Sequence, residues 1–325
     1  FAELGVLILL FEVGLESDLD ELLEGGLQAT LVAVVGVILP FAAGYAIMHW
    51  FGYPPLVAVF VGATFTATSV GITARVLADL GRLQDPAANV VLGAAVVDDI
   101  LGLIILAVVT GVAQTGTVSL AGVALLSGKA VVFLVIALFL GLKLAPALVR
   151  WIGRLRARGT LVVYSLVFAV ALAVLADLIG LATIIGAFAA GLILASTERR
   201  THIEERIRPV ADVLVPVFFV TVGMKVDPAM LNPFAPNAQL GIAMLLTAVA
   251  VASKLAAGLA VVRPGVRRWP VGVGMVPRGE VGLIFAGTGL AVGVVAGDLY
   301  SALVVAVMLT TFVAPPWLKA IYRDR

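Results

Sequence analysis

Two adjacent carboxylates, Asp98 and Asp99, stand in the middle of a long apolar run. The run extends from about Ala87 to Ala113 and contains no other charged residue. At about 1.5 Å per residue, a helix of this length crosses a bilayer and holds both carboxylates near its centre. Because an ionised carboxylate is costly there, the pair requires partner charges, protons or a bound cation. We therefore interpret the Asp pair as a functional site.

A lysine, Lys254, lies in a second apolar run, where an unpaired ammonium would be as costly as an unpaired carboxylate. We expect its partner to be one of the two Asp side chains. Successive residues of a helix point about 100° apart, so Asp98 and Asp99 cannot both face the same neighbour. One can pair with Lys254 while the other faces a water-filled cavity. The alternative is a structural ion pair that only locks two helices together.

Two further runs contain helix-breaking residues near mid-membrane. Thr64–Thr73 gathers hydroxyl groups and a glycine, and Gly274–Gly282 contains Pro277. Pro removes a helix hydrogen bond and Gly relaxes the backbone, so both runs are predicted to unwind where freed carbonyls can meet an ion. The alternative is a simple kink in each run. Arg278 and Glu280 are expected to compensate each other or the dipoles of the half-helices.

The composition indicates an all-α polytopic membrane protein. Of 325 residues, 62% are hydrophobic and only 13% are charged, which is more apolar surface than a water-soluble core can bury. Cysteine is absent, so disulfides and thiolate metal sites are excluded within this chain. The net charge of +1 gives no indication of a nucleic-acid partner, and membrane lipid is the expected surrounding.

Apolar runs separated by Gly, Pro and charged residues predict eleven membrane segments. The first is too short to span a membrane alone. The segments lie near residues 1–15, 25–51, 54–79, 87–113, 119–149, 160–179, 181–197, 209–225, 238–262, 269–295 and 299–320.

The distribution of Lys and Arg predicts the topology. If the segment ending near residue 149 exits into the cytoplasm, five cytoplasmic regions hold 17 of the 21 basic residues. These regions are residues 75–82, 143–158, 199–208 and 263–268 and the C-terminal tail. The connection at residues 16–24 is also assigned to the cytoplasm, but it is acidic and contains no Lys or Arg, so it neither supports nor opposes this topology. We expect a multi-pass protein of the cell inner membrane with a cytoplasmic C-terminus.

Short sequence matches indicate an internal repeat. Val13–Asp18 resembles Val222–Asp227 at an offset of 209 residues, and Val70–Ile72 resembles Val281–Leu283 at an offset of 211. The first match falls at a cytoplasmic end in one half and an external end in the other. This is the pattern of an inverted-topology repeat, as in many secondary transporters.

The repeat predicts the organisation of the chain. Residues 1–325 form a single transmembrane transporter domain, with a first repeat at 1–113, a linking helix at 119–149 and a second, inverted repeat at 160–320. The segments near 160–197 have no counterpart in the first repeat. We therefore expect two more membrane helices and the start of a third before Phe1, so that eleven segments of about thirteen are present.

These motifs resemble monovalent cation:proton antiporter family 2, and most of all the NapA-type bacterial sodium/proton antiporters. The resemblance extends over essentially the whole chain, and its motifs are Ala67–Leu77, Gly93–Gly102, Lys254 and Pro277–Gly282. It implies the NhaA-like fold of inverted repeats with two crossing broken helices. It also implies a homodimer in which a mobile, ion-carrying core works by elevator-like alternating access.

The resemblance also implies roles for particular residues. Asp99 corresponds to the main carboxylate for Na⁺ and H⁺, and Asp98 corresponds to the partner of Lys254. Thr68 and Ser69 correspond to residues at the crossover of the broken helices. Pro277, Arg278 and Glu280 lie in the second broken helix.

The chemistry of one buried carboxylate predicts cation/proton exchange. Such a group can hold a proton or a hard monovalent cation, but not both, because protonation removes the charge that binds the cation. Carboxylate, hydroxyl and carbonyl oxygens suit Na⁺ or Li⁺. We expect a secondary active antiporter that is electrogenic, is no enzyme and needs no cofactor besides the transported Na⁺ and H⁺. A K⁺/H⁺ antiporter or K⁺ efflux protein of the same family is the alternative.

Two other classes of protein fit the sequence less well. A cation channel would use a symmetric ring of carbonyls or charges, whereas this chain has one asymmetric Asp pair and a Lys that repels cations. An intramembrane aspartyl protease needs two carboxylates that face the substrate together. The side chains of adjacent residues on one helix point about 100° apart, so Asp98 and Asp99 cannot face a substrate together.

Overall fold

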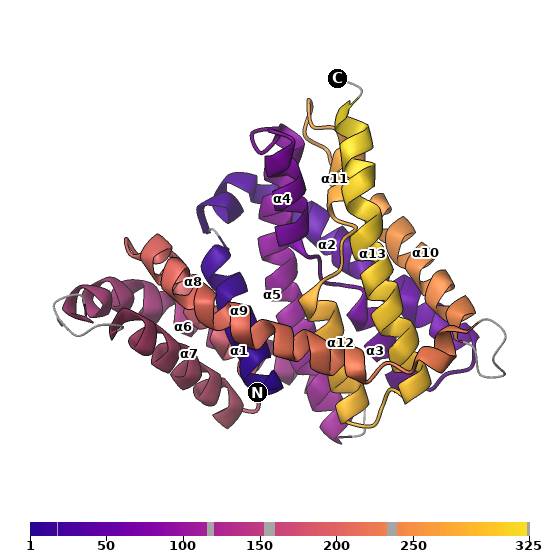
Figure 1. Ribbon diagram of the computed structural model, residues 1–325, viewed down its shortest axis with the longest axis horizontal. Coiled ribbons are helices and arrows are strands. Elements are labelled where there is room, and N and C mark those ends of the chain that lie inside the picture. Colours follow the sequence, from indigo (N-terminus) through magenta and orange to yellow (C-terminus); the bar gives the residue numbers. More distant parts are fainter. Residues whose placement is uncertain (18, 116–119, 153–159, 233–238, 324–325) are drawn as a thin grey trace. The chain divides into compact units, whose positions relative to one another are not determined.

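The computed structural model describes residues 1–17, 19–115, 120–152, 160–232 and 239–323, and these residues form helices joined by short connections, without a β-strand (Figure 1). The chain divides into two compact units. Unit 1 comprises residues 1–19 and 117–223, and unit 2 comprises residues 20–116 and 224–325.

The described residues of unit 1 form five helices. They are α1 (Ala2–Glu16), α6 (Leu120–Ile152), α7 (Thr160–Leu178), α8 (Thr183–Ala195) and α9 (Arg200–Met224). The described residues of unit 2 form eight α-helices and two 3₁₀ turns. They are α2 (Leu19–Trp50), α3 (Pro55–Thr64), α4 (Val70–Asp79), α5 (Pro86–Thr115), η1 (Pro228–Leu231), α10 (Leu240–Ala257), η2 (Gly258–Ala260), α11 (Arg268–Gly274), α12 (Glu280–Ala291) and α13 (Gly297–Arg323).

Each of the eleven predicted membrane segments is helical in the structure. Within the described residues, seven helices are long and apolar enough to cross a membrane, namely α2, α5, α6, α7, α9, α10 with η2, and α13. The shorter helices α1 and α8 and the two helix pairs α3–α4 and α11–α12 account for the other four segments. The protein is therefore a multi-pass membrane protein, as its composition predicts.

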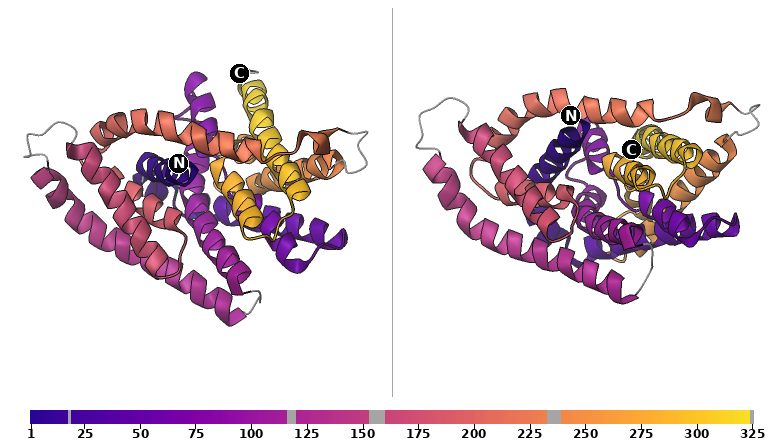
Figure 2. Two further views of the ribbon diagram at one scale, coloured as in Figure 1. Left: turned by 60° about the horizontal axis from the view of Figure 1, so that its bottom comes forward. Right: turned by 90° about the horizontal axis from the view of Figure 1, so that it is seen from below.

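The core of unit 1 is the short helix α8, which is apolar on all sides and buried from Ile184 to Leu194. It lies directly against α1, because a Cβ on Gly14 would stand 2.2 Å from the Phe188 carbonyl oxygen. A Cβ on Gly191 would stand 2.1 Å from the Phe11 carbonyl oxygen. Glycines that bring helix backbones this close are typical of membrane proteins. Helices α6 and α7 run beside α8 (Figure 2).

Unit 2 is organised around its interrupted helices. Helix α3 packs against α12, α11 packs against α5, and α13 contacts both α10 and α4. Helices α4 and α12 begin at Val70 and Glu280, which are 210 positions apart, and α5 and α13 begin at Pro86 and Gly297, which are 211 apart. These spacings match the sequence offsets of the repeat. The inverted orientation, the linking helix and the single transporter domain stay predictions.

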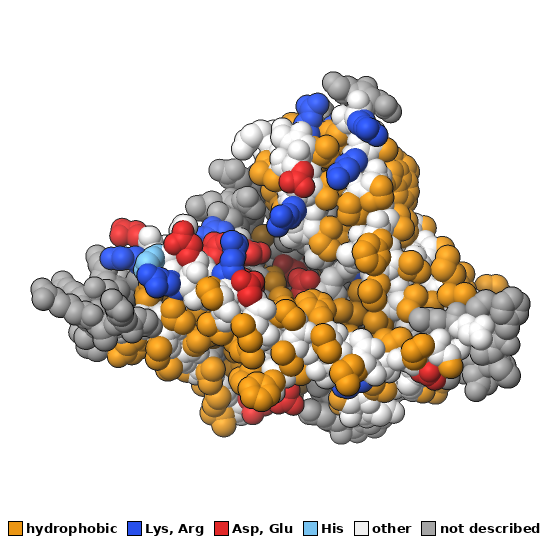
Figure 3. Space-filling view, in the orientation of Figure 1, with side chains coloured by type: hydrophobic (Ala, Val, Ile, Leu, Met, Phe, Trp, Pro, Cys, Tyr) orange, Lys and Arg blue, Asp and Glu red, His pale blue; other side chains and the backbone are white. Residues whose placement is uncertain are grey.

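Three regions with basic residues meet in unit 2. Arg82 follows α4, Arg267 precedes α11, and their guanidinium groups lie 5.7 and 4.7 Å from the ring of Tyr322 near the end of α13. Arg267 also pairs with Asp85 at 2.9 Å. Figure 3 shows Lys and Arg side chains over the same ends of α4 and α13, above a surface that is mostly apolar. The three regions thus share one end of unit 2, and the topology predicted from the sequence places them on one side of the membrane.

Two predicted boundaries were wrong. Helix α9 begins at Arg200, not near residue 209, because Glu204 and Arg208 are spaced i, i+4 and form a 3.3 Å ion pair that supports a helix. The connection predicted at residues 16–24 is helical from Leu19, and the chain bends at Gly26. Gly26 has φ of 50°, a conformation that glycine adopts without strain.

Candidate functional site

Both predicted helix interruptions are present. Residues 65–69 separate α3 from α4, and residues 275–279 separate α11 from α12. The two non-helical segments touch, since the Ser69 amide donates to the Pro277 carbonyl oxygen at 2.9 Å. Thr73 Oγ1 donates to the Gly274 carbonyl oxygen at 2.7 Å. The segments therefore contact each other within unit 2.

Glycine is required where the segments meet. A Cβ on Gly279 would stand 2.6 Å from Ser69 Cβ and 2.7 Å from Ser69 Oγ, closer than atoms can approach. On the other segment, Thr64 Oγ1 donates to the Phe60 carbonyl oxygen and Thr66 Oγ1 donates to that of Ala63, each at 2.8 Å. Both hydroxyls thus bind back to carbonyls of the last turns of α3, a common arrangement for threonine in a helix.

Three elements converge on Lys254. Its Nζ lies 3.2 Å from Asp98 Oδ2 and 2.7 Å from Thr68 Oγ1, and the side chains of Lys254 and Asp98 are fully buried. Thr68 Oγ1 accepts from the ammonium and donates to the Met275 carbonyl oxygen at 3.5 Å. The predicted ion pair is thus present, between α10 and the Asp98 side of α5. The Thr68 hydroxyl links it to both interrupted helices.

Asp99 is in a different situation from Asp98. It is only 5% exposed, and no residue that the structure describes donates a hydrogen bond to its carboxylate. Its charged neighbours are Asp98, Glu280 and Lys254, which act on it electrostatically. Because one residue on a helix is a turn of about 100°, Asp99 cannot share the Lys254 contact of Asp98. A buried carboxylate without a donor is suited to take up a proton or a cation.

Arg278 and Glu280 do not pair with each other, so that part of the expectation was wrong. The fully buried Arg278 donates through Nη1 to the Ala67 carbonyl oxygen at 3.2 Å and through Nη2 to that of Ala250 at 3.4 Å. The interruption of the helix frees the Ala67 carbonyl, which makes it an available acceptor. Glu280 is the first residue of α12, where the helix dipole favours an anion, and accepts from Ser69 Oγ at 3.5 Å.

The structure adds two residues that the sequence did not point out. Thr311 on α13 donates through Oγ1 to the Arg278 carbonyl oxygen. Gly36 on α2 lies beside the lysine, since a Cβ there would stand 3.4 Å from Lys254 Nζ. A hydroxyl and a glycine in apolar runs are weak signals in a chain with 34 glycines.

The described residues contain no group of three or more His, Cys, Asp or Glu side chains that could hold a metal ion. The site has the ligand types that Na⁺ prefers, namely a carboxylate, hydroxyls and non-helical carbonyls.

The transmembrane sodium/hydrogen exchanger family matches residues 1–323. The chain belongs to this family. The high-affinity Na⁺/H⁺ antiporter NhaS3 of Synechocystis is 47% identical over 325 residues, which cover 99% of this chain and 70% of NhaS3. The Na⁺/H⁺-K⁺ antiporter GerN of Bacillus cereus is 39% identical over 323 residues, covering 98% of this chain and 81% of GerN. A Na⁺/H⁺ antiporter of Enterococcus hirae is 32% identical over 324 residues, covering 98% of this chain and 83% of that antiporter.

Membership of the sodium/hydrogen exchanger family confirms the resemblance to cation:proton antiporters that the motifs indicate. The family is one of transporters, and its match includes every residue of the site described above. The roles of the individual residues stay predictions.

Proposed function

We propose that this member of the sodium/hydrogen exchanger family is a secondary active transporter that exchanges Na⁺, or Li⁺, for H⁺ by alternating access, and that it has no enzymatic activity. The observation that carries the proposal is the buried Asp99 carboxylate, which lacks a hydrogen-bond donor among the described residues. It stands next to a charge-paired Asp98 and near the contact of two interrupted helices. The names of NhaS3 and GerN, both Na⁺/H⁺ antiporters, support the same activity.

In this proposal Asp99 carries the cation and the proton in turn. An ionised Asp99 binds Na⁺, and protonation removes the charge that holds it. Each ion therefore displaces the other, which couples their movements. The neighbouring carboxylate, Asp98, forms a buried ion pair with Lys254. Because each charge has the other as its partner, neither is buried alone.

Lys254 gives the exchange its voltage dependence. If the lysine loses its proton when a cation binds beside Asp98, each cycle moves more than one proton per cation. A buried lysine can change its protonation state in this way, because burial opposes its charge and its carboxylate partner favours it. The proposed exchange is therefore electrogenic.

Potassium is the second candidate cation. GerN, which is 39% identical to this chain, carries both Na⁺ and K⁺ in its name. A channel or an aspartyl protease has less support. Asp98 is engaged by Lys254, so the two carboxylates do not face a substrate together as a protease requires.

We further propose that the protein lies in the cell inner membrane with a cytoplasmic C-terminus and acts as a homodimer. The basic residues around Tyr322 support the orientation, because cytoplasmic loops are rich in Lys and Arg. The C-terminal helix shares that end of unit 2.

The test is reconstitution of the full-length protein into liposomes that contain a pH-sensitive dye. After a proton gradient is set, Na⁺, Li⁺ and K⁺ are added in turn, with protein-free liposomes as the control. Release of protons by Na⁺ and Li⁺ is expected. Release by K⁺ alone would replace Na⁺ by K⁺ as the substrate, and no release by any of the three would overturn the proposal.

A further inference from the structure

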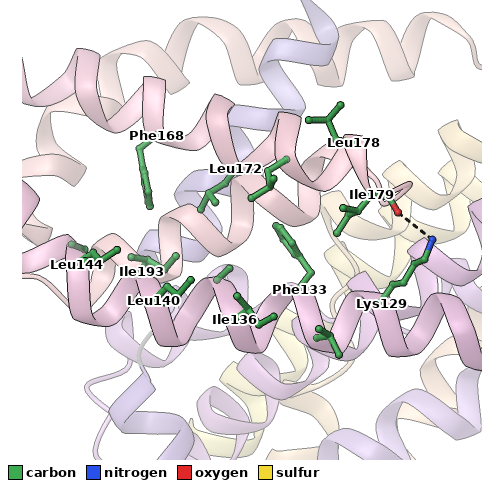
Figure 4. Close-up of a pocket in the computed structure, with 15 residues that line it drawn as sticks. Lys129, Phe133, Ile136, Leu140, Leu144, Phe168, Leu172, Leu178, Ile179 and Ile193 are labelled. Atoms are coloured by element: carbon green, nitrogen blue, oxygen red, sulfur yellow. Dashed lines mark hydrogen bonds between the residues drawn. The ribbon is translucent and has the colours of Figure 1, made fainter.

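A groove in unit 1 takes no part in the proposed exchange. It has a volume of about 780 Å³ and is lined by fifteen residues of α6, α7, α8 and the turn after α7 (Figure 4). Lys129 is the only charged residue among these fifteen, and the others are apolar side chains and one glycine. The volume falls within the range of about 300–1,000 Å³ that is usual for sites of small ligands.

The position of the groove favours an apolar occupant. Helices α6 and α7, which provide most of its walls, are both long and apolar enough to cross a membrane. Side chains such as Phe133, Ile136 and Leu172 face the space and offer water no hydrogen bonds (Figure 4). Water is therefore a poor occupant, and hydrocarbon is a good one.

Lys129 marks one end of the groove. Its Nζ donates to the Ile179 carbonyl oxygen at 3.5 Å, a long hydrogen bond, and the side chain is exposed (Figure 4). Ile179 lies in the turn after α7, where Gly180 has φ of 80°. Because lipid-facing backbone outside a helix is tolerated only near the membrane surface, this end lies at the level of the headgroups. A lysine there extends its amine toward the headgroups.

The charge at that end selects the kind of lipid. An ammonium has three N–H donors, and the contact with Ile179 uses at most one of them. Asp177 is the acidic residue nearest to Ile179 in the sequence, but it does not line the groove and forms no ion pair with Lys129 among the described residues. The free donors and the positive charge fit a phosphate group.

We propose that the groove binds an anionic phospholipid, with its phosphate at Lys129 and one acyl chain along α6. One leaflet accounts for about half of the ~30 Å hydrocarbon core, which corresponds to roughly ten residues of a helix. The chain would therefore extend from Lys129 past Phe133 and Ile136 to about Leu140. This inference does not depend on the cation that the protein transports.

The test uses the full-length protein in detergent, with phosphatidylglycerol or phosphatidylcholine of the same acyl chains, and native mass spectrometry to count bound lipid. The wild type is expected to retain phosphatidylglycerol more strongly. Lys129→Gln should weaken phosphatidylglycerol binding by about fivefold, the usual effect of one lysine near anionic lipid, and leave phosphatidylcholine unchanged. Lys129→Arg should restore binding. Leu140→Trp should weaken binding of both lipids by filling the groove.

Two matched controls lie on the same helix outside the groove. Lys143, whose Nζ stands 4.1 Å from the Phe139 ring centre, is the control for the charge. Val135, which is 59% exposed, is the control for the bulky substitution. Equal effects of Lys129→Gln and Lys143→Gln, or equal retention of the two lipids by the wild type, would overturn the proposal. Leu140→Trp that dissociates a dimer without loss of lipid would show that a second copy fills the groove, and this would also overturn it.

Discussion

Thr68 Oγ1 lies 2.7 Å from Lys254 Nζ, closer than either carboxylate oxygen of Asp98, at 3.2 and 3.5 Å. The hydroxyl also donates to the Met275 carbonyl oxygen, so one threonine joins the buried ion pair to both interrupted helices. A change in the protonation of Lys254 would therefore alter its hydrogen bond with Thr68, at the place where the two interrupted helices meet.

Thr68→Val should destabilise the protein, because it removes a hydrogen bond to a buried charge while the size of the side chain is kept. Such a bond contributes about 1.5–3 kcal/mol. Thermal unfolding in detergent measures the effect, and Thr68→Ser should recover most of it. The control is Thr247→Val on α10, where the hydroxyl only donates back to the Ala243 carbonyl oxygen. Equal losses at Thr68 and Thr247 would show that the lysine contact is unimportant.

Gly279→Ala should be strongly destabilising, because the new Cβ would stand 2.6 Å from Ser69 Cβ and side-chain rotation cannot relieve that contact. Overpacking of this kind costs about 1–3 kcal/mol. Gly287→Ala, within the helix α12 that follows Gly279, is the control, since no listed atom lies within 4 Å of its Cβ position, and it should be neutral or stabilising. The measurement is the melting temperature of each variant in detergent, which should fall for Gly279→Ala and not for Gly287→Ala. A harmless Gly279→Ala would mean that the two segments are not in close contact.

Asp99→Asn should abolish exchange with little loss of folding, because the amide keeps the size of the carboxylate but can bind neither a proton nor a cation by charge. Proton release from liposomes on addition of Na⁺ is the measurement. Asp79→Asn changes an exposed carboxylate at the end of α4 and should leave exchange intact. Robust exchange by Asp99→Asn would rule out Asp99 as the carrier.

The sequence predicts the charged part of the site well, for a physical reason. A carboxylate and an ammonium in apolar runs must find partners, so the pairing of Lys254 with one of the two Asp side chains follows from their cost in a membrane. That the partner is Asp98 was implied only by the family resemblance, and the structure shows that contact. Likewise, Pro277 and the neighbouring glycines predict an interrupted helix, because they weaken the helix locally.

The parts that could not be predicted depend on contacts between distant elements. Arg278 binds carbonyls of Ala67 and Ala250, and such acceptors leave no mark in the sequence because every residue has one. The close approach of Gly14 and Gly191 is equally hidden among many glycines. The early start of α9 was missed because the charged residues 199–208 were taken as a connection that precedes the membrane segment. Charged residues such as Arg and Glu also favour helices, and here they form the first turns of α9.

The double substitution Asp98→Asn with Lys254→Gln should keep exchange but remove its voltage dependence. It deletes the ion pair without leaving either charge buried alone, so it should be tolerated better than either single change. Asp99 then trades one proton for one cation. Transport is measured in liposomes clamped at several potassium-diffusion potentials with valinomycin. Equal voltage sensitivity in the wild type and the double variant would show that Lys254 carries no proton.

The central claim is that a proton and a cation compete for the same carboxylate, and the pH dependence of apparent Na⁺ affinity tests it most directly. The apparent affinity should weaken as pH falls, approaching about tenfold per pH unit well below the apparent pKa of the site, as expected for one competing proton. The measurement is the Na⁺ concentration for half-maximal proton release from liposomes, from about pH 6 to about pH 8.5. A falling affinity toward low pH is the predicted result. An affinity that stays constant over this range while protons are still released would contradict competition at Asp99.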